Sequence, residues 1–289
     1  MFIEKKLDLF IEKIPRRKII DDTVLATKAN PEQISRILDT FINETRVCLN
    51  LIKEYLSPQL HILEVGAGLC LFSLFLKEQG YVITALEPSA GGFELFDKMK
   101  KIILNHYNFL SLTTLEIKAE NLTKNNGKYD LIFSSNVIEH IPDFPSAFDS
   151  MLNVLGPNGK MVHGCPNYII PYEPHLGIPV VKSMKKISEL IFKKKIMQRK
   201  DLWDSLNFVT YFSVRNYAKK NKLNYGFKKK MLYEAFIRID KDTEFRKRHA
   251  KGMFTFIYFF LKYSGLVGLL KYLPAVLSTP MIFELNRRE

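Results

Sequence analysis

The chain has 289 residues, 47% of them hydrophobic and 25% charged, which are the proportions of a globular protein with one large domain and additions. Its 3 cysteines are widely spaced, so neither a disulfide framework nor a cysteine metal site is expected, and a reducing, cytoplasmic compartment is favoured. Charged residues stand where a signal peptide needs its apolar core, which speaks against secretion.

The net charge of +13 is concentrated in one stretch of the chain. Residues 181–251 hold 21 Lys and Arg against 7 Asp and Glu, so the remainder is close to neutral. Such a region can meet anionic lipid or a phosphate-bearing substrate, or it can be the solvated face of a basic protein. Nucleic acid is the least expected partner.

Residues 1–57 show helical patterns and are expected to form an N-terminal helical cap. Asn30 suits an N-cap and Pro31 the first helical position, which predicts a helix to Leu56 that can cover a bound ligand. Residues 58–289 form the second expected domain, in which strand-like apolar runs alternate with helical patterns. The expected strands are residues 60–65, 81–86, 112–118, 129–134 and 159–165. The expected helices between them are residues 69–79, 92–108 and 144–155.

The most specific pattern is a glycine turn at Gly66 and Gly68. The apolar run from His61 to Val65 leads into this turn, a helical pattern follows, and Glu87 ends the next apolar run. Strand, glycine turn, helix, strand and acid form a nucleotide-binding unit. Glycine lets a ligand approach the backbone closely, and the acid can accept hydrogen bonds from both ribose hydroxyls.

Two details separate this turn from a dinucleotide site. Glu64 places a carboxylate before the first glycine, which suits a cationic ligand and would repel a pyrophosphate. Cys70 and Leu71 stand where the dinucleotide fingerprint has its third glycine. With these residues the chain resembles the class I S-adenosylmethionine-dependent methyltransferases, whose methyl donor carries an ammonium group and a sulfonium. An NAD-dependent oxidoreductase is the alternative that both details oppose.

The resemblance covers roughly residues 60–166. Tyr129–Asp143 is similar to the family's fourth strand and the loop after it, and Met151–Val162 to its helix, Gly-Pro-x-Gly turn and fifth strand. The resemblance implies an α/β fold: a Rossmann-like, doubly wound, mostly parallel sheet with helices on both faces and an antiparallel last strand. The candidates for the last elements are a helix at Ser213–Leu223 capped by Ser213, a strand at Tyr225–Leu232 and the final strand at Pro280–Leu285.

The resemblance also implies S-adenosyl-L-methionine as the cofactor. In this reading Glu64 binds the methionine ammonium and Glu87 the ribose hydroxyls. Lys118 replaces an Asp found in many relatives, so contacts from the backbone at Ala119 and Glu120 are expected around the adenine. The residues expected to bind the cofactor are Glu64, Gly66, Ala67, Gly68, Glu87, Pro88, Ala119, Glu120, Ser135 and Asn136.

Glu139 and His140 resemble the Glu-His pair of ubiquinone-biosynthesis-type O-methyltransferases. In those enzymes a further Glu, three residues before the first, can join the pair in binding a divalent cation. Asn136 stands at that position here, so one carboxylate is lost and no metal ligand is predicted. His140 is expected to form a wall of the active site, or else to cap or pack within a local turn.

The segment after the fifth expected strand, residues 165–179, concentrates polar side chains between prolines. His175 is a candidate general base at neutral pH, and Tyr172 and Glu173 are candidates to bind or orient a hydroxylated acceptor. The expected catalytic residues are therefore His140, His175 and Tyr172. The alternative is a rigid loop whose polar groups satisfy one another.

Residues 233–278 are expected to be a basic, aromatic helical insertion near the C-terminus. Lys262 and Lys271 interrupt its apolar runs, so a membrane-spanning helix is not expected. Either it is a lid packed on the core, or its helices lie at the surface of an anionic membrane, which would make the protein membrane-peripheral.

The function expected from these patterns is transfer of a methyl group to an oxygen or nitrogen of an acceptor, with a saccharide or lipid-linked intermediate as the leading candidate. Two alternatives stay open. One is O-methylation of a small phenolic or quinone precursor. The other is a non-catalytic, methyltransferase-like module that binds membrane or nucleic acid through the basic region.

Overall fold

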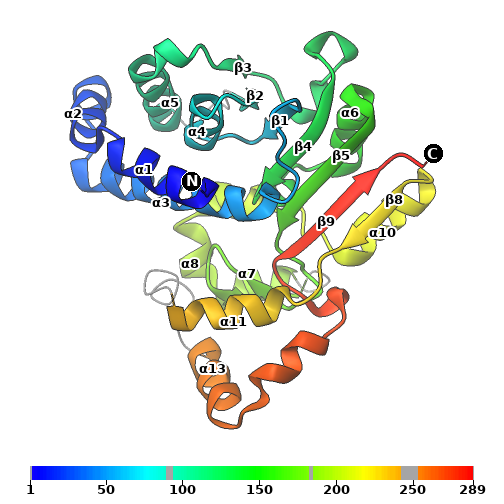
Figure 1. Cartoon of the computed structure of the whole chain (residues 1–289). Coiled ribbons are helices and arrows are strands. Elements are labelled where there is room, and N and C mark those ends of the chain that lie inside the picture. Colours follow the sequence, from blue (N-terminus) through cyan, green and yellow to red (C-terminus); the bar gives the residue numbers. More distant parts are fainter. Residues whose placement is uncertain (1, 89–93, 182–184, 242–252, 289) are drawn as a thin grey trace. The chain divides into compact units, whose positions relative to one another are not determined.

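The structure is a computed structural model that describes residues 2–88, 94–181, 185–241 and 253–288 (Figure 1). The chain divides into two compact units. The first unit comprises Met1–Val137 and Asp143–His163, and the second comprises Ile138–Pro142 and Gly164–Glu289. The basic triplet at residues 246–248 lies outside the described residues.

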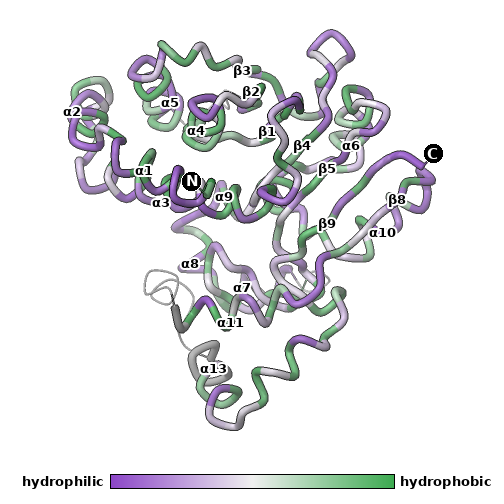
Figure 2. Tube along the Cα trace, viewed as in Figure 1, coloured by the Kyte–Doolittle hydropathy of each residue, from purple (hydrophilic) through white to green (hydrophobic). Residues whose placement is uncertain are grey.

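Three helices open the first unit: α1 (Ile3–Lys13), α2 (Arg16–Thr27) and α3 (Pro31–Ile52). The Asn30 side chain accepts hydrogen bonds from the backbone N–H groups of Glu32 and Gln33, which confirms the predicted cap of α3. Hydrophobic and hydrophilic residues are interleaved along α3 (Figure 2), and its buried residues pack against helix α4 and strand β4, which are defined below.

The remaining elements of the first unit alternate between strand and helix. They are β1 (His61–Val65), α4 (Leu71–Glu78), β2 (Val82–Leu86), α5 (Glu94–His106), β3 (Thr113–Leu115), β4 (Tyr129–Ser135), α6 (Phe144–Val154) and the first nine residues of β5 (Leu155–Cys165). Strand β1 pairs in parallel with β2 and with β4, and β2 pairs in parallel with β3. Because these strands are covered by side chains on both faces, β1 and β4 are almost wholly buried.

The second unit follows the end of β5. Its elements are β6 (Tyr172–Glu173), β7 (Ile178–Pro179), α7 (Lys185–Ile191), α8 (Lys193–Met197), α9 (Lys200–Ser205), α10 (Tyr211–Lys220), β8 (Asn224–Phe227), α11 (Met231–Lys241), α13 (Met253–Tyr263) and β9 (Met281–Asn286). Strands β6 and β7 form a small antiparallel hairpin, and β8 pairs with β9 in antiparallel fashion. A core around the fully buried Trp203 lies among Tyr168, Ile178 and Phe208.

The large sheet has seven strands in the order β3-β2-β1-β4-β5-β9-β8, and β5 is the strand shared by both units. It is mixed, parallel over its first strands and antiparallel at the end, which confirms the expected Rossmann-like α/β fold. Among the described residues no helix is long and apolar enough to cross a membrane. The three cysteines, Cys48, Cys70 and Cys165, are free and buried.

Two details of the last elements differ from the expectations. The N-cap of α10 is Thr210, and Ser213 is the N3 residue of a capping box, so the prediction of Ser213 as the cap was wrong. The expected strand at Tyr225–Leu232 ends at Phe227, because helix α11 begins at Met231.

Candidate active site

The glycine turn directly follows β1, as the sequence predicts. Gly66 and Gly68 have φ angles of +75° and +54°, a region that favours glycine. A Cβ on Gly66 would lie 2.3 Å from a methyl of Val137, and a Cβ on Gly68 would lie 2.2 Å from the Phe41 ring. A side chain at either position would be strained in conformation and would require Val137 or Phe41 to move.

A pocket of about 210 Å³ lies beside this turn within the first unit. Five of the residues expected to bind the cofactor line it: Glu64, Gly66, Ala67, Ser135 and Asn136. They come from the ends of β1 and β4, which are neighbours in the sheet, so the ends of both strands open into one cavity.

Helix α3 supplies the other side of the pocket, including Phe41, Glu44 and Cys48. The Asn136 side chain donates a hydrogen bond of 3.2 Å to Glu44 Oε2, and Asn136 itself has a φ of 55°. The sequence predicts that this helix covers the ligand, but it does not single out these three side chains. Their spacing on one face of an amphipathic helix is the signal that could have found them.

Glu64 lines the pocket and is 4% exposed. The Ser73 hydroxyl donates a hydrogen bond to Glu64 Oε2, and the Cys48 thiol lies 3.9 Å from Oε1. Burial raises the pKa of Glu64 to about 8, because the charged form is poorly solvated there. A positively charged ligand would compensate for the hydration that the buried carboxylate has lost, so the site favours a cation.

Glu87 lies just after β2 and fastens the glycine turn. Its Oε2 atom accepts a hydrogen bond of 2.8 Å from the backbone N–H of Gly68. The N–H groups of Gly66 and Ala67 donate to the carbonyl of Leu86, at 2.8 and 3.1 Å. Burial raises the pKa of Glu87 above its ordinary value.

The other expected cofactor residues lie outside the lining of the 210 Å³ pocket. The Phe41 ring lies against Gly68, and Glu87 and Pro88 directly follow β2. Ala119 and Glu120 form a short 3₁₀ turn, Ala119–Asn121, after β3, and the Glu120 carbonyl accepts a hydrogen bond from Ser150. The structure thus brings the residues expected around the methionine end together and leaves those expected around the ribose and adenine outside this cavity.

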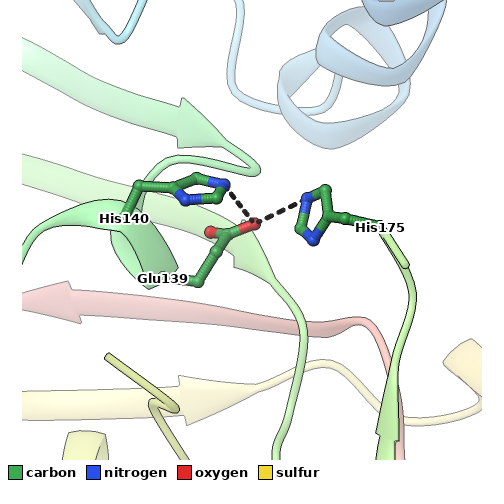
Figure 3. A group of neighbouring side chains, drawn as sticks. All are labelled: Glu139, His140 and His175. Carbon is green, nitrogen blue, oxygen red and sulfur yellow. Dashed lines mark ion pairs between the residues drawn. The ribbon is translucent and has the colours of Figure 1, made fainter. Parts of the chain in front are cut away.

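The second unit contains a separate cluster of Glu139, His140 and His175 (Figure 3). Glu139 and His140 lie in a 3₁₀ turn, Ile138–His140, and His175 lies in the hairpin loop between β6 and β7. Glu139 Oε1 lies 4.0 Å from His140 Nε2 and 3.8 Å from His175 Nε2. Figure 3 shows both rings turned toward this one carboxylate oxygen.

A second layer of groups holds the two rings. His175 Nδ1 lies 2.5 Å from Glu173 Oε1, and the same carboxylate accepts hydrogen bonds from the backbone N–H groups of His175 and Leu176. His140 Nδ1 lies 2.8 Å from the Ser205 hydroxyl. Burial lowers the pKa of His140 to about 4. Burial also opposes charge on His175, but its bond to Glu173 and the charge of that carboxylate outweigh it, so its pKa is raised.

Tyr172 belongs to the same hairpin but to its other face. Successive side chains of a strand point to opposite sides, and Glu173 is fully buried whereas Tyr172 is half-buried. Burial raises the pKa of the Tyr172 hydroxyl. The structure therefore brings His140 and His175 together, with ring centroids 5.2 Å apart, whereas Tyr172 lies on the other face of the hairpin that carries His175.

Asn207 holds the turn that carries Glu139 and was missed in the sequence. Its amide donates to the carbonyls of Ile138 and Ile141, at 2.6 and 2.7 Å, and its Oδ1 accepts from Val209 N–H at 2.8 Å. A lone Asn between two apolar runs has no sequence signature for this role, because its partners are backbone groups about 70 residues earlier.

Comparisons with known proteins agree with the fold. Residues 25–219 match a family described as a methyltransferase domain. An uncharacterized protein of Mycobacterium tuberculosis is 33% identical over 234 residues, which are 78% of each chain. A ubiquinone biosynthesis O-methyltransferase of Rickettsia akari is 27% identical over 104 residues, 36% of this chain and 39% of that protein.

Among solved structures, phosphoethanolamine N-methyltransferase 2 of Haemonchus contortus, in complex with S-adenosyl-L-methionine, is similar in fold. It has a TM-score of 0.50 and 17% identity, and the match covers 86% of this chain and 53% of that one. The chain thus spans about half the length of that protein. The chain belongs to this methyltransferase domain family and has the fold of the class I S-adenosylmethionine-dependent methyltransferases.

Proposed function

We propose that the chain transfers the methyl group of S-adenosylmethionine to an oxygen or nitrogen of a saccharide or lipid-linked acceptor. The observation behind this proposal is that one chain contains two different kinds of site. The first unit has a pocket suited to a cationic cofactor, and the second has two histidines held around a buried carboxylate. The chain passes directly from Asn136, which lines the pocket, to Glu139 in the cluster.

In the first unit we propose that Glu64 binds the methionine ammonium and that Gly66, Ala67, Ser135 and Asn136 line the methionine end. Glu64 supports this because its burial makes a bound cation favourable. The proposed partners of the ribose and adenine are Gly68, Glu87, Pro88, Ala119 and Glu120. For these to reach the cofactor, the Phe41 ring must move off Gly68, since it packs against the turn at that point.

In the second unit we propose that His140, His175 and Tyr172 act on the acceptor. Methyl transfer is an in-line displacement in which the cofactor supplies the leaving group, so the protein must orient the acceptor and promote loss of its proton. The two Nε2 atoms beside Glu139 are suited to that loss, since Glu173 and Ser205 fix both rings through Nδ1. Tyr172 would contact the acceptor from the same hairpin.

A second pocket supports a saccharide or phosphate-bearing acceptor. It lies in the second unit, has a volume of about 600 Å³, and its lining includes Tyr211, Tyr225, Phe227, Lys229 and Lys271. Aromatic rings pack against the apolar faces of sugars, and lysines attract phosphate. An acceptor that carries a phosphate-linked sugar matches this combination.

We also propose that the protein contacts an anionic membrane. Tyr263 and Tyr272 are 81% and 83% exposed, and Phe260 and Leu269 are also exposed in the same part of the chain, near Lys262 and Lys271. Exposed aromatics among lysines suit the surface of an anionic membrane. In a flotation assay we expect the protein to rise with vesicles that contain phosphatidylglycerol and not with neutral ones. Equal flotation with both kinds of vesicle would contradict the proposed contact with an anionic membrane.

The acceptor can be tested with labelled methyl groups. We would incubate the protein with S-adenosylmethionine carrying a labelled methyl and with separate lipid-linked saccharides, free saccharides and catechols. We expect the label to appear in the lipid-linked saccharides. His175→Gln should lower the transfer rate about 100-fold or more while leaving cofactor affinity unchanged. His61→Gln, an exposed residue at the start of β1, is the matched control and should behave as wild type.

Methylation of a small phenolic or quinone precursor is the second candidate. The similarity to the ubiquinone biosynthesis O-methyltransferase of Rickettsia akari favours it, although that similarity covers 36% of this chain. Label found in the catechol alone would select this candidate over the saccharide. Bound cofactor without label in any class would instead favour a non-catalytic module.

A further inference from the structure

The atoms of the second-unit cluster converge on one point. Glu139 Oε1, His140 Nε2 and His175 Nε2 belong to a group of ligand atoms that all lie within 4.8 Å of one another. Glu139 is fully buried, and the two histidines are partly buried. The two distances from the carboxylate oxygen, 4.0 and 3.8 Å, are too long for direct hydrogen bonds.

The hydrogen bonds of Ser205 determine which nitrogen of His140 carries the proton. The Ser205 hydroxyl donates its one hydrogen to the Leu202 carbonyl at 2.7 Å. It can therefore act toward His140 Nδ1 as an acceptor, so Nδ1 carries the hydrogen of the neutral ring. The Nε2 atom of His140 then presents a lone pair to Glu139.

His175 is arranged in the same way. The Glu173 carboxylate accepts from His175 Nδ1, so in the neutral ring the proton lies on Nδ1 and the lone pair lies on Nε2. A carboxylate that holds one nitrogen of a histidine while the other faces a shared centre is the second-shell pattern of metal-binding histidines. Two lone pairs and a carboxylate oxygen thus face a common centre, which a cation would stabilise.

We propose that Glu139, His140 and His175 bind a divalent transition-metal ion of the Zn²⁺ type. Two imidazoles and one carboxylate are a ligand set for such ions and leave a coordination position for a further ligand. Ligand atoms around tetrahedral zinc are about 3.3 Å apart, given bond lengths of about 2.0–2.1 Å. The separations of 4.0 and 3.8 Å from Glu139 Oε1 would need to shorten by about 0.7 and 0.5 Å, which side-chain rotation can supply.

This site differs from the cation site of the ubiquinone-biosynthesis-type O-methyltransferases, whose Glu-His pair Glu139 and His140 resemble. In those enzymes a carboxylate at the position three residues before this Glu completes the ligand set. Here that position is Asn136, which has no carboxylate. In this chain the third ligand is His175, which lies 35 residues after His140 and is brought back by the hairpin of β6 and β7. The sequence predicts no metal ligand because the motif itself does not contain His175.

The use of the metal in catalysis rests on the proposed function, whereas its binding does not. A cation at this point would lower the pKa of an acceptor hydroxyl that reached its open position. The proton would then leave from the coordinated hydroxyl, and His175 would serve as a ligand rather than as the base.

The test is a metal titration of the full chain. We would strip the protein with a chelator, remove the chelator, and titrate it with ZnCl₂ by calorimetry and with CoCl₂ by visible absorption. We expect one ion per chain, with the intense visible bands of four-coordinate Co²⁺. Glu139→Gln and His175→Gln should each weaken binding at least about 100-fold. His106→Gln, a histidine of α5 paired with Asp22, is the control and should bind like wild type.

Each outcome decides the inference. Binding that is absent in the wild type, or equal in the wild type and both variants, overturns it. Binding of S-adenosylmethionine, measured in parallel, verifies that each variant is folded and tests the proposed function separately. If the stripped wild type transfers methyl at full rate and His175→Gln does not, the metal has no part in the transfer and the methyltransferase proposal stands with His175 as the base, while the titration alone decides whether the site binds a metal.

Discussion

The proposed cofactor pocket of the first unit and the histidine cluster of the second unit are built in different ways. The pocket combines the ends of two adjacent parallel strands with one helix face, and its chemistry depends on backbone shape and one buried acid. The cluster combines a 3₁₀ turn, a hairpin loop and helix α9, and its chemistry depends on the orientation of two imidazoles.

The proposed roles of the two regions account for this difference. The cofactor carries both the methyl group and its leaving group, so the unit that holds it needs to bind and position rather than to move protons. The acceptor must lose a proton when its nucleophile is an oxygen, which requires groups that titrate or coordinate. The two regions can therefore be disturbed separately, by variants that affect either cofactor binding or methyl transfer.

The largest effect is expected from Gly68→Ala. Alanine would be strained at the φ of +54°, and its Cβ would occupy the face of the turn that the proposed cofactor site uses once the Phe41 ring has moved, so we expect cofactor affinity to fall about 100-fold. Calorimetric titration with S-adenosylmethionine measures this. Gly80→Ala is the matched control, because Gly80 has a φ of +87° with nothing near its Cβ position. If both variants bind alike, the close contact at Gly68 does not matter for the cofactor.

Asn207→Ala should affect the second region and leave the first intact. It removes two side-chain hydrogen bonds to the turn carrying Glu139 and one to Val209 N–H in its own segment, so we expect about 2–3 kcal/mol less free energy of unfolding. We also expect slower methyl transfer with unchanged cofactor affinity in the folded protein. Asn221→Ala, which removes one bond at the end of α10, should cost much less. A loss of cofactor affinity in Asn207→Ala would show that the two regions are not separable.

Glu64 should couple cofactor binding to pH. Its pKa is raised to about 8 in the free protein, so it is mostly protonated at pH 7, and a bound ammonium would lower that pKa. Binding at pH 7 should therefore release a proton, and affinity should rise as the pH approaches about 8. Calorimetry in buffers of different ionisation enthalpy measures the release. Glu64→Gln should abolish it; an equal release from this variant would assign the proton to another group.

The smallest effect is expected from Asn30→Ala. The Asn30 side chain caps α3, which carries Phe41, Glu44 and Cys48 of the pocket. Its removal should lower the free energy of unfolding by about 1 kcal/mol, measured by denaturant unfolding. Cofactor affinity should stay close to that of wild type, because the cap lies three turns from Phe41. A much larger loss of affinity would mean that the start of α3 is part of the binding site.

The first region could be predicted from the sequence to a greater extent than the second. Glu64, the two glycines and Asn136 lie at strand ends, and in a parallel sheet such ends meet at one edge whatever the rest of the fold does. The residues of α3 were not predicted individually, because a helix face is selected by packing rather than by a motif. The N-cap of α10 is a second example. It is Thr210 rather than Ser213, and the sequence does not distinguish them because both residues suit a capping box.

The second region depends on contacts between distant segments. Ser205 and Asn207 act on His140 and on the turn of Glu139 from more than 60 residues away, and neither has a local signature. His175 was predicted as a candidate base from its loop, but its approach to Glu139 depends on the β6–β7 hairpin. A hairpin of two-residue strands has too few residues to show a pattern in the sequence.

The most direct test of the account is calorimetric titration of the wild type, Glu87→Ala and Glu94→Ala with S-adenosylmethionine and with NADH. Glu87 fastens the glycine turn, whereas Glu94 is an exposed acid of α5. The account expects micromolar binding of S-adenosylmethionine and none of NADH, with affinity lowered at least about tenfold in Glu87→Ala and unchanged in Glu94→Ala. Binding of NADH, or equal affinity of Glu87→Ala and wild type for S-adenosylmethionine, would contradict it.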